Sequence, residues 1–497
     1  MTGGSDPWYM KRVVDYILAQ NAHLVVDADR FYPIGGINPR PPLFSWSLAI
    51  GAMILQPVLG ENAVWWSMLA LPAVYGALTI WPVAAIARDH FGKAAGVIAA
   101  WLIAFMPAHV THSTWGLADH DSFVMLFIVL GFMFYLRAVK YAGSERLVRS
   151  TSIHPVDMLR AMGAVARERK YAMSNAVLAG VAFGAASLGW KGFVAGPAIL
   201  FLAYAAQVAL NMFRRRDSTI LSTLFLTMLL TNLLIAMPFY AHPQMNLMLN
   251  ATGLQPFLFI LLFTVVITYI TTGFRDKPWL LVLGTLAVGA TVFLGALYVL
   301  KVANLSNAWD VLFTGSGYFT KTKIFGTVAE ANAPDRGYMF ASFGPIVFVF
   351  ALVVGLTSLW RTFSQRSQIS LVFAVWIFTA SYMSWTAARF LFNATPVVAV
   401  MGAAGIVGFW KWSDWNSLVR NWRRAGIRTP SERIAGARRA VWRTPSFSAV
   451  VLVLIMLSGQ QLTYGLDSAI PSNSPAESDM DESMYYSVPD IMRWDAL

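Results

Sequence analysis

Long apolar runs recur along most of the chain and are separated by polar segments. A helix that crosses the hydrocarbon core of a bilayer needs about 20 consecutive, mostly apolar residues. Runs of roughly that length with almost no charge predict transmembrane helices at residues 64–87, 92–114, 121–142, 174–190, 192–213, 220–241, 255–274, 278–301, 341–360, 369–388, 391–410 and 446–465. The pattern therefore predicts an all-α polytopic membrane protein with about 12 spans and long outer loops.

Polar stretches divide the chain into three parts. Residues 1–63 are a first outer loop, in which the short apolar run 43–59 predicts an interfacial or re-entrant helix. Residues 64–465 are the transmembrane bundle, interrupted by a polar insertion at residues 302–340. We interpret this insertion as a lid, because glycines alternate with apolar side chains in it; a permanently packed loop is the alternative. Residues 466–497 form an acidic outer tail.

The composition supports the membrane assignment and excludes some chemistry. Hydrophobic residues make up 57% of the chain and charged residues 12%, whereas a soluble domain carries roughly twice that charged fraction. The chain has 0 cysteines, which excludes disulfides and thiolate catalysis. The net charge of +12 does not indicate a nucleic-acid partner, because cytoplasmic loops of membrane proteins are rich in Lys and Arg.

Lys and Arg residues gather in alternate connections between the predicted spans. The basic clusters lie at residues 137–170, 214–216, 275–277, 361–366 and 411–443. Threading the spans alternately puts all of these clusters on one side, which must be cytoplasmic. The first loop, the Asp119 turn, the 302–340 insertion and the tail then share the opposite face. We therefore predict a multi-pass protein of the cell membrane whose active site is extracytoplasmic.

The most informative polar turn contains Asp119, His120 and Asp121, between two apolar spans. Carboxylates beside lipid are costly and are usually retained for function. Two acids separated by one residue can converge on a hard divalent cation, which prefers oxygen ligands. The alternative is a solvated turn that happens to carry two acids. His112 and His120 could also be ligands, but we interpret them as loop residues or as residues that support the ligands.

Other charged residues fall on the same predicted outer face. Asp6 lies in the first loop and Glu330 in the insertion, where a solvated loop acid is the alternative. Arg389 lies at the outer end of a span; it suits a phosphate held in a bidentate manner, unless it extends to lipid headgroups instead. Lys191 follows Trp190 at an outer turn and also suits a lipid phosphate.

Four of these segments together resemble motifs of one enzyme family. The segments are Gly4-Ser5-Asp6-Pro7-Trp8-Tyr9, Asp119-His120-Asp121, Thr327-Val328-Ala329-Glu330 and Arg389-Phe390 with Pro396 following. Taken in this order, they resemble the catalytic subunit of oligosaccharyltransferase, and the whole pattern is most similar to the archaeal, single-subunit enzymes. The resemblance covers nearly the whole chain and implies the transmembrane fold of a GT-C type glycosyltransferase.

The resemblance also implies a reaction and roles for the residues. The family moves a glycan from a polyprenyl (dolichyl) phosphate or pyrophosphate to Asn in Asn-x-Ser/Thr sequons. Asp6, Asp119 and Asp121 would hold Mn²⁺ or Mg²⁺, and Asp6 with Glu330 would hold the acceptor amide. Arg389, and less directly Lys191, would contact the lipid phosphate or the acceptor. The implied partners are the lipid-linked oligosaccharide, the acceptor polypeptide and membrane lipids.

Two family features have no counterpart in the sequence. The family carries a further span before the Asp6 segment and a soluble C-terminal domain with a Trp-Trp-Asp-x-Gly motif. Trp65-Trp66 is followed by Ser67 and lies in a predicted span. The resemblance therefore implies a transmembrane portion without these pieces, with the tail 466–497 leading toward the absent soluble domain.

Two other functions remain as alternatives. A different polyprenyl-phosphate-dependent glycosyltransferase, such as a protein O-mannosyltransferase, would share the architecture and early acids, but it would leave the segment ending at Glu330 unexplained. A secondary transporter would use intramembrane acids to couple ions, and such proteins often contain internal repeats and broken helices. We see no such repeat, and the acids cluster at the outer boundary.

Overall fold

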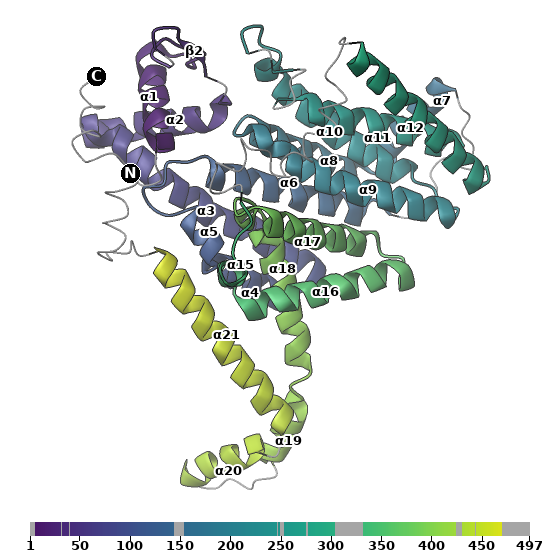
Figure 1. Cartoon of the computed structure of the whole chain (residues 1–497). Helices are drawn as coiled ribbons and strands as arrows, with labels where there is room; N and C mark the ends of the chain where they lie inside the picture. The colour runs from purple at the N-terminus through teal and green to yellow at the C-terminus, as the bar shows by residue number, and fades with distance from the viewer. Residues whose placement is uncertain are drawn as a thin grey trace.

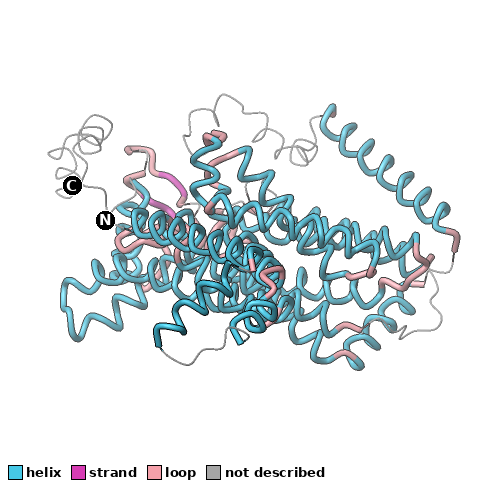
Figure 2. Tube along the Cα trace, turned by 90° about the horizontal axis from the view of Figure 1, so that it is seen from below, coloured by secondary structure: helices cyan, strands magenta, loops and turns pink. Residues whose placement is uncertain are grey.

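The computed structural model describes residues 5–30, 32–38, 40–143, 154–245, 247–248, 253–274, 277–303, 332–423, 430–442 and 444–469. Within these ranges the chain is almost entirely helical, as Figures 1 and 2 show. One short antiparallel ribbon, β1 (Val26–Asp27) with β2 (Gly36–Ile37), lies near the N-terminus. The predicted all-α membrane fold is confirmed.

The helices follow the apolar pattern of the sequence. In order they are α1 (Ser5–Gln20), α2 (Pro42–Leu59), η1 (Gly60–Asn62), α3 (Ala63–Phe91), α4 (Lys93–Ala104), α5 (Pro107–Thr111), α6 (Asp121–Tyr141), α7 (Pro155–Glu168), α8 (Lys170–Ser187), η2 (Lys191–Val194), α9 (Ala195–Phe213), α10 (Thr219–Tyr240), α11 (Gln255–Gly273), α12 (Trp279–Val302), α15 (Arg336–Phe343), α16 (Pro345–Ser364), α17 (Gln368–Thr386), α18 (Phe390–Lys411), α19 (Trp415–Arg423), α20 (Pro430–Trp442) and α21 (Pro445–Ala469).

Among the described residues, 10 helical segments are long and apolar enough to cross a membrane. Every predicted span coincides with a helix, but two of them differ from the prediction. The span expected at 92–114 breaks after α4, because Pro107 has no backbone N–H to continue a helix and α5 starts there. The span expected at 174–190 is α8, which is less apolar because Lys170, Ser174 and Asn175 lie in its first two turns.

The weaker apolarity of α8 is explained by its position. It packs between α6 and α10 and keeps one exposed face, which includes Val177, Leu178 and Val181. A Cβ atom built on Gly180 of α8 would lie 2.5 Å from the backbone oxygen of Met228 on α10. Small residues on α8 therefore let the backbones approach closely, as is usual where membrane helices pack together. Close packing against α6 and α10 thus contributes to holding α8 in place.

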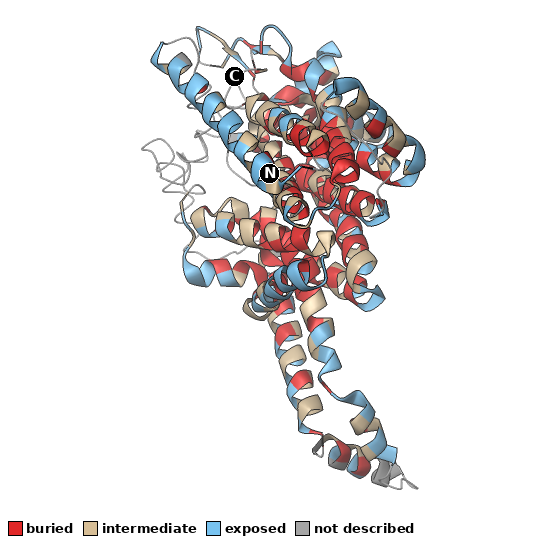
Figure 3. Cartoon of the chain, turned by 90° about the vertical axis from the view of Figure 1, so that its right-hand side faces the viewer, coloured by how far each residue is buried: buried red, intermediate tan, exposed pale blue. Residues whose placement is uncertain are grey.

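Figure 3 shows the buried residues gathered inside the main bundle and fewer in the helices that project from it. Many residues of α6 and α18 belong to this core. In α6, 72% of the apolar window is buried inside the protein, and the segment containing α18 reaches the same share. The corresponding shares are 11% for α12 and 22% for α21. Figure 1 shows α12 at one edge and α19 and α20 beyond the end of α18, from where α21 runs back toward α5. The two most deeply buried spans are thus the ones that carry the candidate site at their starts.

The N-terminal part forms its own small layer against the bundle. Met10, Val13, Val14 and Ile17 form the buried face of α1, which packs on α2. Arg12 donates from Nη2 to the buried Asp27, 2.8 Å away, which ties α1 to the ribbon. The predicted interfacial run 43–59 is helical, as α2, and leads through η1 into α3. Its position relative to the membrane surface stays a prediction.

Candidate metal and phosphate site

The connection between α5 and α6 is held firmly against α3. The backbone N–H of Gly116 donates to the carbonyl oxygen of Leu69, 3.0 Å away. The Trp115 ring meets the edge of the Trp66 ring, with centroids 5.7 Å apart. Asp119 and His120 end this connection, and Asp121 is the first residue of α6. Three consecutive polar side chains are therefore presented at the start of the buried helix α6.

These three side chains form a compact cluster of possible metal ligands. One ligand atom from each of Asp119, His120 and Asp121 lies within 4.8 Å of the other two. His120 Nδ1 is 2.6 Å from Asp119 Oδ1, and His120 Nε2 is 3.9 Å from Asp121 Oδ1. His112 Nδ1 lies 2.8 Å from the other oxygen of Asp121. Carboxylate oxygens and imidazole nitrogens in this arrangement suit a divalent cation.

The charges in the cluster stabilise one another. Burial would raise the pKa of Asp119, but the positive charge of His120 and hydrogen bonds from its ring and backbone outweigh burial, so this pKa lies below its usual range. Burial would lower the pKa of His120, but the charges of Asp119 and Asp121 outweigh burial and raise it above 6.5. A cation bound here would therefore compete with the proton on His120.

Asp6 lies apart from this cluster. It is in the first turn of α1, its carboxylate is exposed, and it forms an ion pair with the guanidinium of Arg40. The Arg40 guanidinium also lies over the Tyr9 ring, 4.9 Å from the centroid. Its charge helps to lower the pKa of Asp119 and opposes the rise in the pKa of His120. Arg40 is thus close enough to influence both regions. A ligand role for Asp6 stays a prediction, and it would require Arg40 to release the carboxylate.

Arg389 and Lys191 lie on the two helices that border the cluster. Arg389 is half-buried at the N-cap of α18, and Phe392, one turn further, stacks on the His112 ring with centroids 4.8 Å apart. Lys191 is half-buried and opens η2 immediately after Trp190, whose ring centroid is 6.1 Å from that of His120. Lys191 therefore directly follows a residue that lies near the cluster, and Arg389 lies one turn before a residue that contacts His112. These positions are compatible with a role in phosphate binding.

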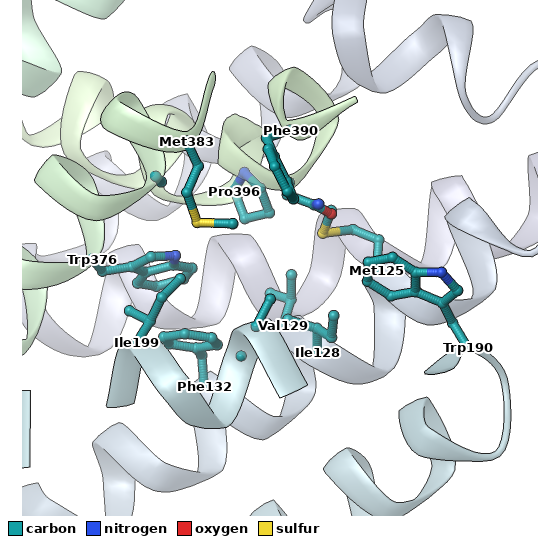
Figure 4. A pocket seen from close by; sticks show the side chains of 14 residues that line it. Met125, Ile128, Val129, Phe132, Trp190, Ile199, Trp376, Met383, Phe390 and Pro396 are labelled. Carbon is teal, nitrogen blue, oxygen red and sulfur yellow. The ribbon is translucent and has the colours of Figure 1, made fainter. Parts of the chain in front are cut away.

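An apolar cavity begins beside the same residues. Figure 4 shows it enclosed by side chains of α6, α9, α17 and α18, with Trp190 at one end. Phe132 of α6 and Trp376 of α17, which both line the cavity, stack on each other with ring centroids 4.0 Å apart. Phe390, the neighbour of Arg389, also lines the wall. Trp190 is the lining residue whose ring lies near His120, whereas Asp119, His120 and Asp121 do not line the cavity themselves.

Glu330 lies outside the described residues, as do residues 304–331 of the predicted insertion and the tail from residue 470. The acceptor role of Glu330 and the lid function of the insertion therefore stay predictions. Sequence reasoning ranked a ligand role for His120 below a loop or supporting role, whereas the structure places His120 between the two acids within the cluster. That reasoning gave no role to Arg40 and no signal for Phe392.

Comparisons with known proteins agree with this arrangement. Residues 3–404 match the family model described as oligosaccharyl transferase STT3, N-terminal. A relative from Archaeoglobus fulgidus, dolichyl-phosphooligosaccharide-protein glycotransferase 3, is 26% identical over 426 residues, covering 81% of this chain and 46% of the relative. The chain therefore spans about half the length of this curated relative.

Solved structures of the A. fulgidus oligosaccharyltransferase share the fold. The apo form has a TM-score of 0.73 at 19% identity, covering 99% of this chain and 55% of that one. AglB from the same organism, in complex with an inhibitory peptide and a dolichol-phosphate, has a TM-score of 0.72 at 20% identity, covering 97% and 55%. A complex with Zn and sulfate has a TM-score of 0.61 at 19% identity, covering 99% and 53%.

Proposed function

The chain belongs to the oligosaccharyl transferase STT3 family, and we propose that it moves a glycan from a polyprenyl (dolichyl) phosphate or pyrophosphate to Asn of Asn-x-Ser/Thr sequons. Its transmembrane fold is that of the GT-C glycosyltransferases. The observation that carries the proposal is the Asp119-His120-Asp121 cluster at the start of the buried helix α6. This membership favours glycan transfer over the O-mannosyltransferase and transporter alternatives.

The chemistry requires the leaving phosphate to be neutralised. Asp119, Asp121 and His120 fit a divalent cation, Mn²⁺ or Mg²⁺, which when bound would stabilise the negative charge that develops on the leaving group. Arg389 would supply further positive charge through bidentate hydrogen bonds to the phosphate, and Lys191 would add a weaker contact. The solved complex of the A. fulgidus oligosaccharyltransferase with Zn and sulfate supports the binding of a divalent cation and of an anion.

The acceptor side needs acids that hold the Asn amide. An amide nitrogen is a poor nucleophile because its lone pair is conjugated with the carbonyl group. Carboxylates that accept hydrogen bonds from the NH₂ group would orient it and weaken that conjugation, and we assign this role to Asp6 and Glu330. Transfer would then occur directly from the carrier to the amide nitrogen.

The donor lipid would lie with its phosphate at the cluster and its isoprenoid chain against the apolar surface of the bundle. The enclosed cavity lined by Met125, Ile199 and Met383 has a volume of about 30 Å³, which is room for only about one or two water molecules, so it does not hold that chain. The dolichol-phosphate bound by A. fulgidus AglB supports a lipid-linked donor. We also propose that the enzyme acts as a single subunit on an acceptor polypeptide.

The site would face away from the cytoplasm in the cell membrane. This orientation follows from the basic connections, which include the exposed Arg420 and Arg423 of α19. Because the chain has 0 native cysteines, single cysteines give an unambiguous topology test. Cysteine at the exposed Asn62 should react with an impermeant maleimide on intact cells, and cysteine at the exposed Asn416 should react only after lysis. The reverse pattern would overturn the orientation.

The activity itself is tested by a reconstituted transfer assay. The 497-residue chain, in liposomes with a dolichyl-phosphate-linked glycan and an Asn-x-Thr peptide, should glycosylate the peptide in the presence of Mn²⁺. Chelation with EDTA should abolish the product, and added Mn²⁺ should restore it. Peptide with Gln in place of Asn is the matched control. Transfer that is insensitive to chelation would remove the metal mechanism, and absence of any transfer would count against the function of the chain.

A further inference from the structure

Two histidines of the α5 region face one aromatic ring of α18. His109 on α5 and His112 at its C-terminal end are three residues apart, a spacing that places both rings on one side of a helix. The His109 ring lies nearly parallel to Phe392, with centroids 5.8 Å apart and 16° between planes. His112 stacks on the same ring at 4.8 Å and 21°. Phe392 therefore fixes the orientation of both imidazoles.

The two histidines differ in what their other atoms contact. His112 Nδ1 lies 2.8 Å from Asp121 Oδ2. His109 is 3% exposed, and its Nε2 lies 3.2 Å from the carbonyl oxygen of Gly76 on α3. A Cβ atom at Gly76 would lie 2.4 Å from that of Ser113, so α5 is pressed directly against α3. One histidine thus contacts the acid of the cluster, while the other contacts the helix behind it.

The hydrogen bond to His112 determines which oxygen of Asp121 faces the cluster. An ionised carboxylate only accepts hydrogen bonds, so His112 Nδ1 must be the donor. Its partner is Oδ2, whereas Oδ1 is the oxygen that faces His120, 3.9 Å away. The bond therefore prevents Asp121 from rotating freely and leaves Oδ1 directed at the shared ligand position.

We propose that His112, held by Phe392, is a positioning residue that aims Asp121 at the bound cation. The inference rests on the cation site of the proposed function. Because Phe392 lies one turn beyond Arg389 on α18, the same stack would keep the start of α18 in register with the cation site. A shift of α18 would then alter cation binding and phosphate contact together.

The magnitude follows from the general behaviour of residues that orient metal ligands. Loss of such a hydrogen-bonding partner typically weakens metal binding about 10–100-fold. His112→Phe keeps a ring that can stack on Phe392 but removes the donor. His112→Asn keeps an N–H donor close to the position of Nδ1 and removes the ring. His109→Phe is the matched control, because it replaces the other histidine that stacks on Phe392 and leaves the hydrogen bond between His112 and Asp121 in place.

The experiment measures Mn²⁺ affinity of the purified 497-residue chain, by the electron paramagnetic resonance signal of free Mn²⁺. His112→Phe should weaken binding about 10–100-fold, while His112→Asn and His109→Phe should stay within about threefold of the unmodified chain. Recovery by Asn identifies the hydrogen bond, which a merely structural loss would not show. Unchanged affinity in His112→Phe, or a loss that Asn does not restore, would overturn the proposal.

Two further measurements keep the outcomes distinct. If His112→Phe does not yield a monodisperse protein, His112→Leu removes the same donor; a loss of about 10–100-fold supports the proposal and unchanged affinity overturns it. Asp119→Ala separates the inference from its premise. If Mn²⁺ binding of the unmodified chain is absent or is unaffected by Asp119→Ala, the proposed cation site is wrong, and the positioning role of His112 is wrong with it. If Asp119→Ala abolishes binding and His112→Phe does not weaken it, only the positioning role fails.

Discussion

Asp119 and Asp6 are both acids within the influence of Arg40, but they are held in different ways. Asp119 is half-buried within a cluster whose members come from one turn, and its pKa lies below the usual range despite burial, owing mainly to His120. Asp6 is exposed on the first turn of α1 and is neutralised by Arg40. The difference indicates that part of the proposed cation site is formed by neighbouring residues of one turn. Asp6 would contribute only if its carboxylate left the Arg40 guanidinium and bound the metal ion instead.

The sharpest test of this difference is Asp119→Ala. Removing a carboxylate from the preformed cluster should weaken Mn²⁺ binding by at least about 100-fold, more than loss of a supporting residue would. Binding is measured by titration of the purified chain. Asp15→Ala is the control, since Asp15 is an exposed acid of α1 that pairs with Lys11. A similar loss in both variants would mean that general negative charge, and not the cluster, attracts the cation.

The next largest effect concerns pH. His120 has a pKa raised above 6.5, and its protonated ring cannot bind a cation. Mn²⁺ affinity should therefore rise by up to about tenfold per pH unit until the pH passes that raised pKa, and then level off. In His120→Asn the slope should flatten. An identical pH profile in this variant would exclude His120 as the competing proton site.

A smaller effect is expected for Asp6→Ala. If Asp6 becomes a ligand only after leaving Arg40, its net contribution is reduced by the ion pair that must break, and we expect about tenfold weaker binding. The comparison with Asp119→Ala is made in the same titration. Equal losses in the two variants would contradict the division into a preformed cluster and a recruited acid, and no loss at all would remove Asp6 from the ligand set.

The smallest effect is expected for Arg40→Gln, and it has the opposite sign. Loss of the guanidinium frees Asp6 and removes a positive charge that acts on Asp119, so Mn²⁺ should bind about two- to fivefold more tightly. Lys11→Gln, which removes an α1 cation paired with Asp15, is the control. Weaker binding in Arg40→Gln would show that Arg40 supports the site instead of competing for its acid.

Much of the fold could be predicted from apolar runs because a membrane restricts the choice. Every backbone polar group in lipid must be satisfied within its own segment, so a long apolar run specifies a helix almost by itself. The prediction was wrong where a local feature of the sequence interrupts the helix within an apolar run. Pro107 divides the expected span at 92–114, a signal present in the sequence that the apolar pattern obscured.

The candidate site also has one part that the sequence specifies and another that depends on the tertiary structure. The sequence by itself determined that Asp119, His120 and Asp121 would share one turn, since adjacent residues at the start of a helix cannot lie far apart. It also suggested Arg389 and Lys191 at the ends of apolar segments, because cations near lipid are costly and rarely accidental.

Only the tertiary structure decided which distant side chains meet that turn. Phe392 stacks on His112 although the two residues are 280 positions apart in the chain. Trp190, which precedes η2, lies near His120, and Arg40 forms an ion pair with Asp6. None of these partners has a local signature, because packing between helices depends on which faces interlock and not on the periodicity of either one. The sequence thus specified the helices and the ligand turn, and the packing of α5, α6 and α18 specified how those ligands are aimed.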